Sequence, residues 1–111
     1  MQIKSLNDCN VVQMEEKLDA LTSDEVEKAL MGLIDNGAKR IVCVFELTEY
    51  ISSAGLRVLL VVAKKLKKMG GELVLCSLKP LVYKVLDMAG FISIFKIFGS
   101  EEEALKSPQE K

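Results

Sequence analysis

The sequence predicts a single α/β domain, in which a small mixed β-sheet of about five strands packs with about four α-helices. Residues 41–45 form an unbroken apolar run rich in β-branched side chains, which is typical of a strand buried on both faces. Leu56, Leu59, Leu60, Ala63 and Leu66 then recur at helical spacing, and a second apolar run follows at 73–76. This succession indicates a βαβ unit with parallel strands. Half of the 111 residues are hydrophobic, enough for one core.

The segment before this unit predicts a hairpin and a helix. Residues 2–5 and 11–14 have strand character, and the turn composition of 7–10 favours an antiparallel pairing. Thr22 or Ser23 is placed to cap a helix that Asn36-Gly37 ends. The apolar face of that helix is expected to contain Val26, Ala29, Leu30, Leu33 and Ile34.

The segment after the unit predicts the remaining elements, giving the order β-β-α-β-α-β-α-β-α. Gly70-Gly71 ends the central helix, which runs from about Ser53 to Lys68, and Pro80 opens the next helix. Residues 94–98 alternate like a last strand, and 99–105 read as a short helix. We expect one domain over 1–106 and a frayed tail over 107–111. The buried face of the helix at Pro80 is expected to contain Leu81, Val82, Val85, Leu86 and Ala89, with Gly90 as its stop.

Two serines stand where the central helix begins. A helix start leaves backbone N–H groups without partners and carries partial positive charge, so a serine oxygen or an anion is favoured there. Ser53 is placed to cap this helix, and a phosphoryl group on it would sit where the helix dipole helps. Gly55 has no Cβ and lets a partner approach the first turn closely. The simpler alternative is that the serine only caps.

Residues 50–56, Tyr-Ile-Ser-Ser-Ala-Gly-Leu, resemble the signature of STAS-domain anti-sigma-factor antagonists. In that comparison Ser53 matches the family's phosphoacceptor, Ala54 the variable position and Gly55 the glycine. Ser52 stands where the family usually has Asp, and it provides a second possible acceptor. The order of elements matches the STAS fold along essentially the full length.

Three further residues belong to the predicted partner-binding surface. Residues 15–20 resemble the family's Gly-x-Leu-Asp element, with Glu16 in place of Gly, and Asp19 matches the Asp that lies near the phosphoserine loop. The alternative is that Asp19 is only a loop residue. Arg57 stands where many members have Gly, and contacts either the partner or the phosphoryl group, or is a solvated helix arginine. Glu49, if nearby, makes the surface more acidic.

The resemblance implies a bacterial cytoplasmic protein that switches partners. The unphosphorylated form would bind an anti-sigma factor, itself an ATP-using serine kinase, and free a sigma factor. Phosphorylation at Ser53 would switch binding off, and a metal-dependent serine phosphatase of the PP2C type would reset it. The chain would be a substrate and binding module rather than an enzyme, a monomer or weak dimer. The alternative is an unphosphorylated STAS scaffold, or an accessory subunit of a sensory assembly or transporter.

Composition weighs against other functions. There is no histidine, no phosphate-binding G-x-x-x-x-G-K-S/T and no C-x-x-C, so we expect no catalytic centre, cofactor or metal. A two-component receiver would need an aspartate at the end of a central strand and an acidic pair upstream, whereas Glu46 is the only acid at the end of the strand at 41–45. The net charge of −1 and the absence of aromatic residues around the lysines of 64–68 weigh against nucleic acid. The longest apolar run, 58–63, is too short for membrane insertion.

The three cysteines are expected to be reduced thiols. Cys43 and Cys76 lie in expected strands, and Cys9 lies in an expected turn. A small-ligand binder is a third option.

Overall fold

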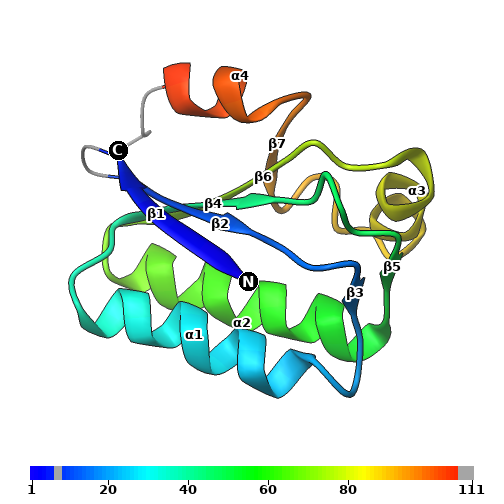
Figure 1. Cartoon of the computed structure of the whole chain (residues 1–111), viewed down its shortest axis with the longest axis horizontal. Helices are drawn as coiled ribbons and strands as arrows, with labels where there is room; N and C mark the ends of the chain where they lie inside the picture. The colour runs from blue at the N-terminus through cyan, green and yellow to red at the C-terminus, as the bar shows by residue number, and fades with distance from the viewer. Residues whose placement is uncertain (7–8, 108–111) are drawn as a thin grey trace.

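A five-stranded mixed sheet forms the centre of the protein (Figure 1), for which a computed structural model describes residues 1–6 and 9–107. The spatial order of its strands is β1-β2-β4-β6-β7. The first pair is antiparallel and the others are parallel, which confirms the predicted hairpin, the βαβ unit and the mixed sheet. The strands are β1 (Gln2–Leu6), β2 (Cys9–Gln13), β4 (Arg40–Val44), β6 (Glu72–Cys76) and β7 (Lys96–Phe98).

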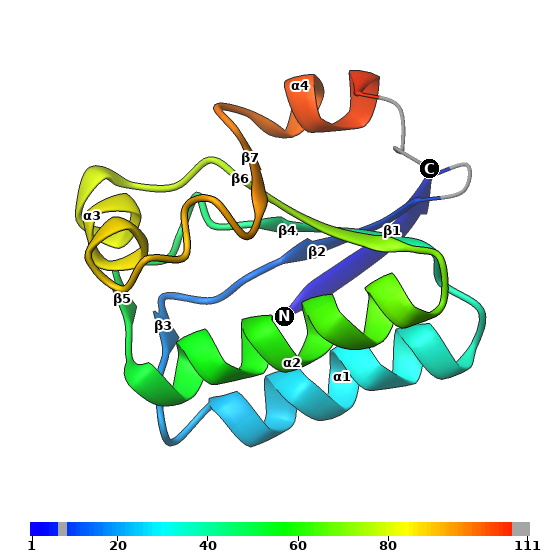
Figure 2. The ribbon, with the colours of Figure 1, turned by 180° about the vertical axis from the view of Figure 1, so that it is seen from behind.

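Four helices surround this sheet within the described residues. The helices α1 (Ser23–Asp35) and α2 (Ser53–Lys68) lie side by side on one face (Figures 1 and 2). The short helix α4 (Glu101–Lys106) covers the other face. Helix α3 (Pro80–Met88) lies at one end of the sheet, next to the small strand β5 (Tyr50–Ile51). The order predicted from the sequence for the five strands of the main sheet and the four helices is therefore confirmed.

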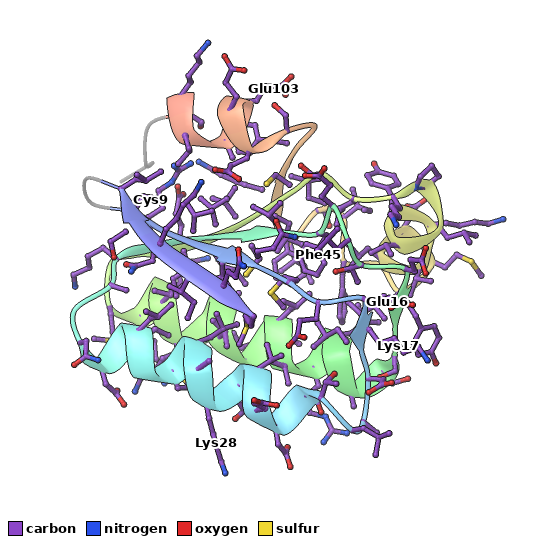
Figure 3. The ribbon with its side chains drawn as sticks, in the orientation of Figure 1. Cys9, Glu16, Lys17, Lys28, Phe45 and Glu103 are labelled. Carbon is purple, nitrogen blue, oxygen red and sulfur yellow. The ribbon has the colours of Figure 1, made fainter. Side chains whose placement is uncertain are left out.

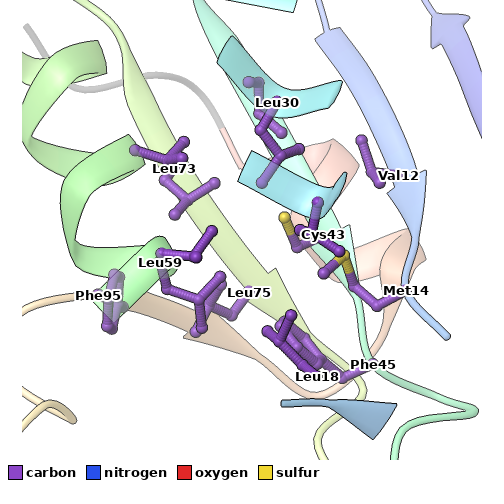
Figure 4. Close-up of a cluster of buried hydrophobic side chains, with 14 of the residues drawn as sticks. Val12, Met14, Leu18, Leu30, Cys43, Phe45, Leu59, Leu73, Leu75 and Phe95 are labelled. Carbon is purple, nitrogen blue, oxygen red and sulfur yellow. The ribbon is translucent and has the colours of Figure 1, made fainter. Parts of the chain in front are cut away.

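The core has one cluster on each face of the sheet. Between the sheet and helices α1 and α2, Leu30 and Leu59 come from the two helices to pack with strand residues such as Cys43 and Leu75 (Figure 4). Under α4, a smaller cluster gathers around Ala104. All five residues of β4 are buried, because this strand has a strand on each side and a helix layer on each face. The second cluster contains Cys9, Val11, Val42, Val44, Val74, Cys76 and Ala104.

A two-stranded sheet, which we did not predict, stands apart from the main one. It pairs β3 (Lys17–Leu18) in parallel with β5, so that Lys17 lies opposite Tyr50 and Leu18 opposite Ile51. Each strand has only two residues, too few for an alternating pattern to show in the sequence. This small sheet fixes the segment that enters α2.

Several local expectations were wrong. Cys9 and Asn10 belong to β2 and not to a turn; the remaining turn residues, 7–8, lie outside the described residues, as do 108–111 of the predicted tail. Strand β7 begins only at Lys96, because the amide of Ile94 donates to the carbonyl of Phe91 in a turn. Phe95 points into the core instead, in edge-to-face contact with Phe91.

Helix α3 also buries less of its apolar side than expected. Val82 and Leu86 are buried, but Leu81 is 72% exposed, and Val85 and Ala89 are exposed too. The helix lies at the end of the sheet, where only a narrow stripe of the helix surface contacts other elements. On α1, by contrast, Val26, Leu30 and Ile34 are buried as predicted, while Ala29 and Leu33 are half-buried.

Glycines end three of the helices. Gly37, Gly70 and Gly90 have φ values of 97°, 80° and 79°, the left-handed conformation expected at these positions. Gly71 has a different role from the one predicted. A Cβ there would overlap the backbone carbonyl of Lys39, so this glycine permits close contact between two chain segments.

Candidate functional site

The two serines at the start of α2 have different roles. Ser52 is the N-cap, with extended backbone, and its hydroxyl oxygen accepts a hydrogen bond of 3.3 Å from the backbone N–H of Gly55. Ser53 is the first helical residue and its side chain is exposed. The prediction that Ser53 caps the helix was therefore wrong by one residue. Because Ser52 performs the capping, the Ser53 hydroxyl is left accessible.

The electrostatic setting at Ser53 favours a negative charge. The first turn of α2 contains no acidic residue, so the partial positive charge of the helix start is not neutralised by its own side chains. The lysines of the last turn, Lys65, Lys67 and Lys68, complement the opposite end. An anion at the first turn would be stabilised by about 0.3–1 kcal/mol.

The strand β3 holds the start of α2 in place. The backbone N–H of Ser52 donates a hydrogen bond of 2.9 Å to the carbonyl of Leu18. Gly55 is buried against the same residue: a Cβ on it would lie 2.5 Å from the Leu18 carbonyl oxygen and 2.7 Å from the Leu18 Cγ. Its missing side chain thus serves this internal contact, whereas sequence reasoning explained it by the approach of a partner. The part that Leu18 plays was missed, since nothing distinguishes it from other core leucines.

Asp19 lies beside the serine loop and also shapes a turn. It directly follows Leu18, so the pairing of β3 with β5 brings it next to the segment that contains Ser52. Its carboxylate Oδ1 accepts hydrogen bonds from the backbone N–H groups of Leu21 at 3.0 Å and Thr22 at 3.2 Å. Thr22 does not cap α1 with its side chain; its hydroxyl instead accepts from the N–H of Asp19 and donates to the carbonyl of Lys17. Both interpretations of Asp19 are therefore compatible with its position.

Glu49 precedes β5 and contributes to a neighbouring groove. Its carboxylate forms an exposed ion pair with Lys79 at 3.5 Å, and its backbone N–H donates to the Glu16 carbonyl at 2.7 Å. Figure 3 shows Glu16 and Lys17 on the β3 segment, at the end of the molecule where α2 starts. Lys79 offsets the acidity expected from Glu49. The groove, of about 540 Å³, is lined by Met1, Gln2, Gln13, Met14, Glu15, Glu16, Leu47, Glu49 and Lys79.

Sequence reasoning missed Thr48, which lies between Glu49 and the strand β4. It is fully buried, and its hydroxyl donates a hydrogen bond of 2.7 Å to the carbonyl of Glu15. This contact ties the chain before β3 to the chain before β5. A single threonine in a polar stretch gives no signal of such a contact.

The remaining predicted residues lie on the first turns of α2. Ala54 is half-buried beside Ser53, and Arg57 is exposed one turn further along. Among the described residues Arg57 has no ion pair and no side-chain hydrogen bond. The structure therefore brings Ser52, Ser53, Ala54, Gly55 and Arg57 together at one helix start, with Asp19 next to it and Glu49 on the preceding loop.

The described residues contain no other arrangement that indicates chemistry. No group of three or more Cys, Asp or Glu side chains among them is placed to hold a metal ion. All three cysteines are free and buried, and burial raises the pKa of each thiol. Within the same residues, no helix combines the length and apolarity needed to cross a membrane.

Comparison with known proteins supports the resemblance noted in the sequence. The STAS domain family model matches residues 1–104. A candidate anti-sigma factor antagonist of Bordetella bronchiseptica, BtrV, is 45% identical over 87 residues, covering 78% of this chain and 75% of that protein. The anti-sigma F factor antagonist of Paenibacillus polymyxa is 32% identical over 96 residues, covering 86% and 82%.

Solved structures agree on the fold. The Bacillus anti-sigma factor antagonist SpoIIAA superposes with a TM-score of 0.82 in its unphosphorylated form, at 24% identity over 94% of this chain and 91% of that one. Its phosphorylated form gives a TM-score of 0.75, at 23% identity over 94% and 95%. Together, the family model and the relatives show that this chain belongs to the STAS-domain anti-sigma-factor antagonist family.

Proposed function

We propose that this chain is an anti-sigma-factor antagonist whose binding is controlled by phosphorylation of Ser53. The unphosphorylated form binds an anti-sigma factor and thereby frees a sigma factor; the phosphorylated form does not bind. The observation that carries this proposal is that Ser53 is exposed at the helix start while its neighbour Ser52 provides the cap. The names of the relatives BtrV and the Paenibacillus polymyxa protein support the kind of partner.

The switch acts at the surface and leaves the fold intact. A phosphoryl group adds about −1.5 to −2 charges at neutral pH. Within residues 1–6 and 9–107 the Ser53 side chain has no hydrogen bond to lose, and the start of α2 favours the added charge. Phosphorylation therefore places bulk and negative charge on the docking surface, which disfavours a partner fitted to a small hydroxyl.

Ser52 is the poorer acceptor of the two. It is half-buried, and its hydroxyl oxygen is engaged with the N–H of Gly55. A kinase would have to break the cap to modify it, at a cost of about 0.5–2 kcal/mol. Ser53 requires no such rearrangement.

The surface around Ser53 defines the docking region. It comprises Asp19, Glu49, Ser52, Ala54, Gly55 and Arg57, of which Gly55 is buried and contributes by letting the helix start pack against Leu18. The anti-sigma factor is proposed to be the serine kinase that brings ATP, and a PP2C-type phosphatase brings the metal and restores the hydroxyl. The chain itself is the substrate, and acts in the cytoplasm as a monomer or weak dimer.

A binding experiment with charge variants tests this proposal. The tagged chain is isolated from its source cells, the co-purifying partner is identified, and the Kd is measured for wild type, Ser53→Ala and Ser53→Asp. We expect Ser53→Ala to bind like wild type and Ser53→Asp to bind at least tenfold more weakly with an unchanged melting temperature. Ser5→Asp on the exposed strand β1, outside the docking region, is the control for added charge. Equal affinity of Ser53→Asp and wild type would overturn the proposal, and capture of transporter or sensory subunits alone would favour the scaffold alternative.

A further inference from the structure

We propose that Arg57 is the internal partner of the phosphoryl group on Ser53, so that modification folds the arginine back along α2 and neutralises its positive charge on the docking surface. This inference takes from the proposed function only the identity of the modified residue. It assigns to Arg57 a regulatory role that the unmodified protein does not display.

The helix geometry places the two side chains within reach. Ser53 is the first residue of α2 and Arg57 lies four residues later, so both are on one helix face, with Cβ atoms about 5–6 Å apart. Side chains in a helix lean toward its N-terminus, which directs the arginine toward the serine. Both side chains are exposed, so no packed group separates them. An acidic group four residues before a basic one is the favourable order for such a pair.

Within the described residues, no charged group near the start of α2 binds the Arg57 guanidinium, so it is available to bind a phosphoryl group. It forms no ion pair with any described residue, and the first turn of α2 contains no acid. Two acids on the neighbouring segments have other contacts: Asp19 accepts from the turn at 21–22, and Glu49 pairs with Lys79. Among the described residues, no strong anion lies on the helix face that Ser53 and Arg57 share. Phosphorylation of Ser53 would supply one there.

Two other charged side chains near the start of α2 could also act on the phosphoryl group, so their effects must be separated from that of Arg57. Glu16 and Lys17 lie on the β3 segment, which packs against the start of α2, and both are exposed. Glu16 would oppose the phosphoryl charge. Lys17 is the cation on this segment that could act in place of Arg57, and it provides the matched control.

The chemistry of the pair favours arginine. A guanidinium group presents a planar set of donors that binds two phosphate oxygens at once, whereas an ammonium acts as a point charge. A nearby cation stabilises the doubly charged phosphate and therefore lowers its second pKa, which lies near 6. The pair would thus be visible in the titration of the phosphoserine itself.

Phosphorus NMR on protein with phosphoserine incorporated at position 53 through an expanded genetic code tests the inference without any kinase. The phosphate is titrated in wild type, Arg57→Gln and Lys17→Gln at low salt. We expect the second pKa of the phosphate to rise by about 0.3 pH unit in Arg57→Gln, and not in Lys17→Gln. Arg57→Lys should fall between wild type and Arg57→Gln.

Two results would overturn the inference: identical titration of wild type and Arg57→Gln, or a larger rise in Lys17→Gln than in Arg57→Gln. Circular dichroism of the unmodified variants confirms that each is folded. Because the phosphoserine is introduced during synthesis, a negative result in the phosphate titration would not change the result expected from the Ser53→Asp binding experiment. Failure of that experiment would likewise leave the Arg57 pair standing.

Discussion

The backbone N–H of Ser52 donates to the carbonyl oxygen of Leu18 across 2.9 Å, which joins the N-cap of α2 to the strand β3, 34 residues earlier in the chain. This bond continues the short pairing of β3 with β5 up to the first residue before α2. The helix start that presents Ser53 is therefore fixed to a second segment, which carries Asp19. The docking surface is built from both.

Gly55→Ala should destabilise the protein, because a Cβ at this position would lie 2.5 Å from the Leu18 carbonyl oxygen, and backbone cannot move aside cheaply. We expect a loss of about 1–3 kcal/mol in the free energy of unfolding, measured by urea denaturation. Gly32→Ala in α1 is the matched control, because nothing lies within 4 Å of its added Cβ. That variant should gain about 0.5–1 kcal/mol, so equal effects at the two glycines would contradict this account of Gly55.

Ser52→Ala should cost about 0.5–2 kcal/mol, since it removes the N-cap of α2. Ser52→Asp should retain most of the stability, because aspartate caps as well as serine. Ser53→Ala should leave stability within about 0.5 kcal/mol of wild type, because its exposed side chain has no cap bond to lose. Thermal unfolding of the three variants ranks them, and a larger loss in Ser53→Ala than in Ser52→Ala would reverse the roles assigned to the two serines.

Glu72→Ala should be strongly destabilising, by about 3–5 kcal/mol. Its carboxylate binds the buried Arg40 at 2.7 Å and Lys96 at 3.3 Å, so its loss would leave the buried guanidinium, which also donates to the Ala104 carbonyl, without the carboxylate that balances its charge. Chemical denaturation measures the loss. The double variant Arg40→Met, Glu72→Leu should recover much of it, since no buried charge is then uncompensated. A double variant as unstable as Glu72→Ala alone would show that charge pairing is not the cause.

The buried thiols should make the protein less stable at high pH. Burial raises the pKa of Cys43 above its ordinary value of 9.0, so the folded state keeps the thiol neutral where the unfolded state ionises. The stabilising contribution is complete below pH 9 and is lost as the pH rises above it. Unfolding midpoints measured at several pH values between 7 and 10 test whether the stability falls as the pH rises. A folded-state Cys43 that reacts with thiol reagents at pH 8 as fast as in urea would contradict it.

The sequence predicted the main sheet and helices because their signals are long and repetitive. The apolar run of β4 and the helical spacing in α2 each extend over several residues that are buried as expected. The short pair β3–β5 could not be predicted, since two residues carry no periodicity. The exposed side of α3 was missed for another reason: Leu81 and Val85 fit an apolar stripe, but only the tertiary arrangement decides how much of it is covered.

The candidate site was located by its motif, but its internal roles were not. Serine is favoured as a cap at a helix start, so the sequence predicts that one of the two serines caps α2. Which of them does so depends on where the helix begins, and a sequence locates a helix boundary only to within one or two residues. The function of Gly55 depends on Leu18, which is distant in sequence and joined to the loop only by the fold. The ion pair of Glu49 with Lys79 depends in the same way on the position of α3.

The most direct test of the central claim is phosphopeptide mapping by mass spectrometry of the protein isolated from its source cells under several growth conditions. Our account predicts phosphate on Ser53, with Ser52 unmodified in the same peptide. Phosphate on Ser52 alone would contradict the assignment of the acceptor. The absence of phosphate under every condition would contradict the switch itself.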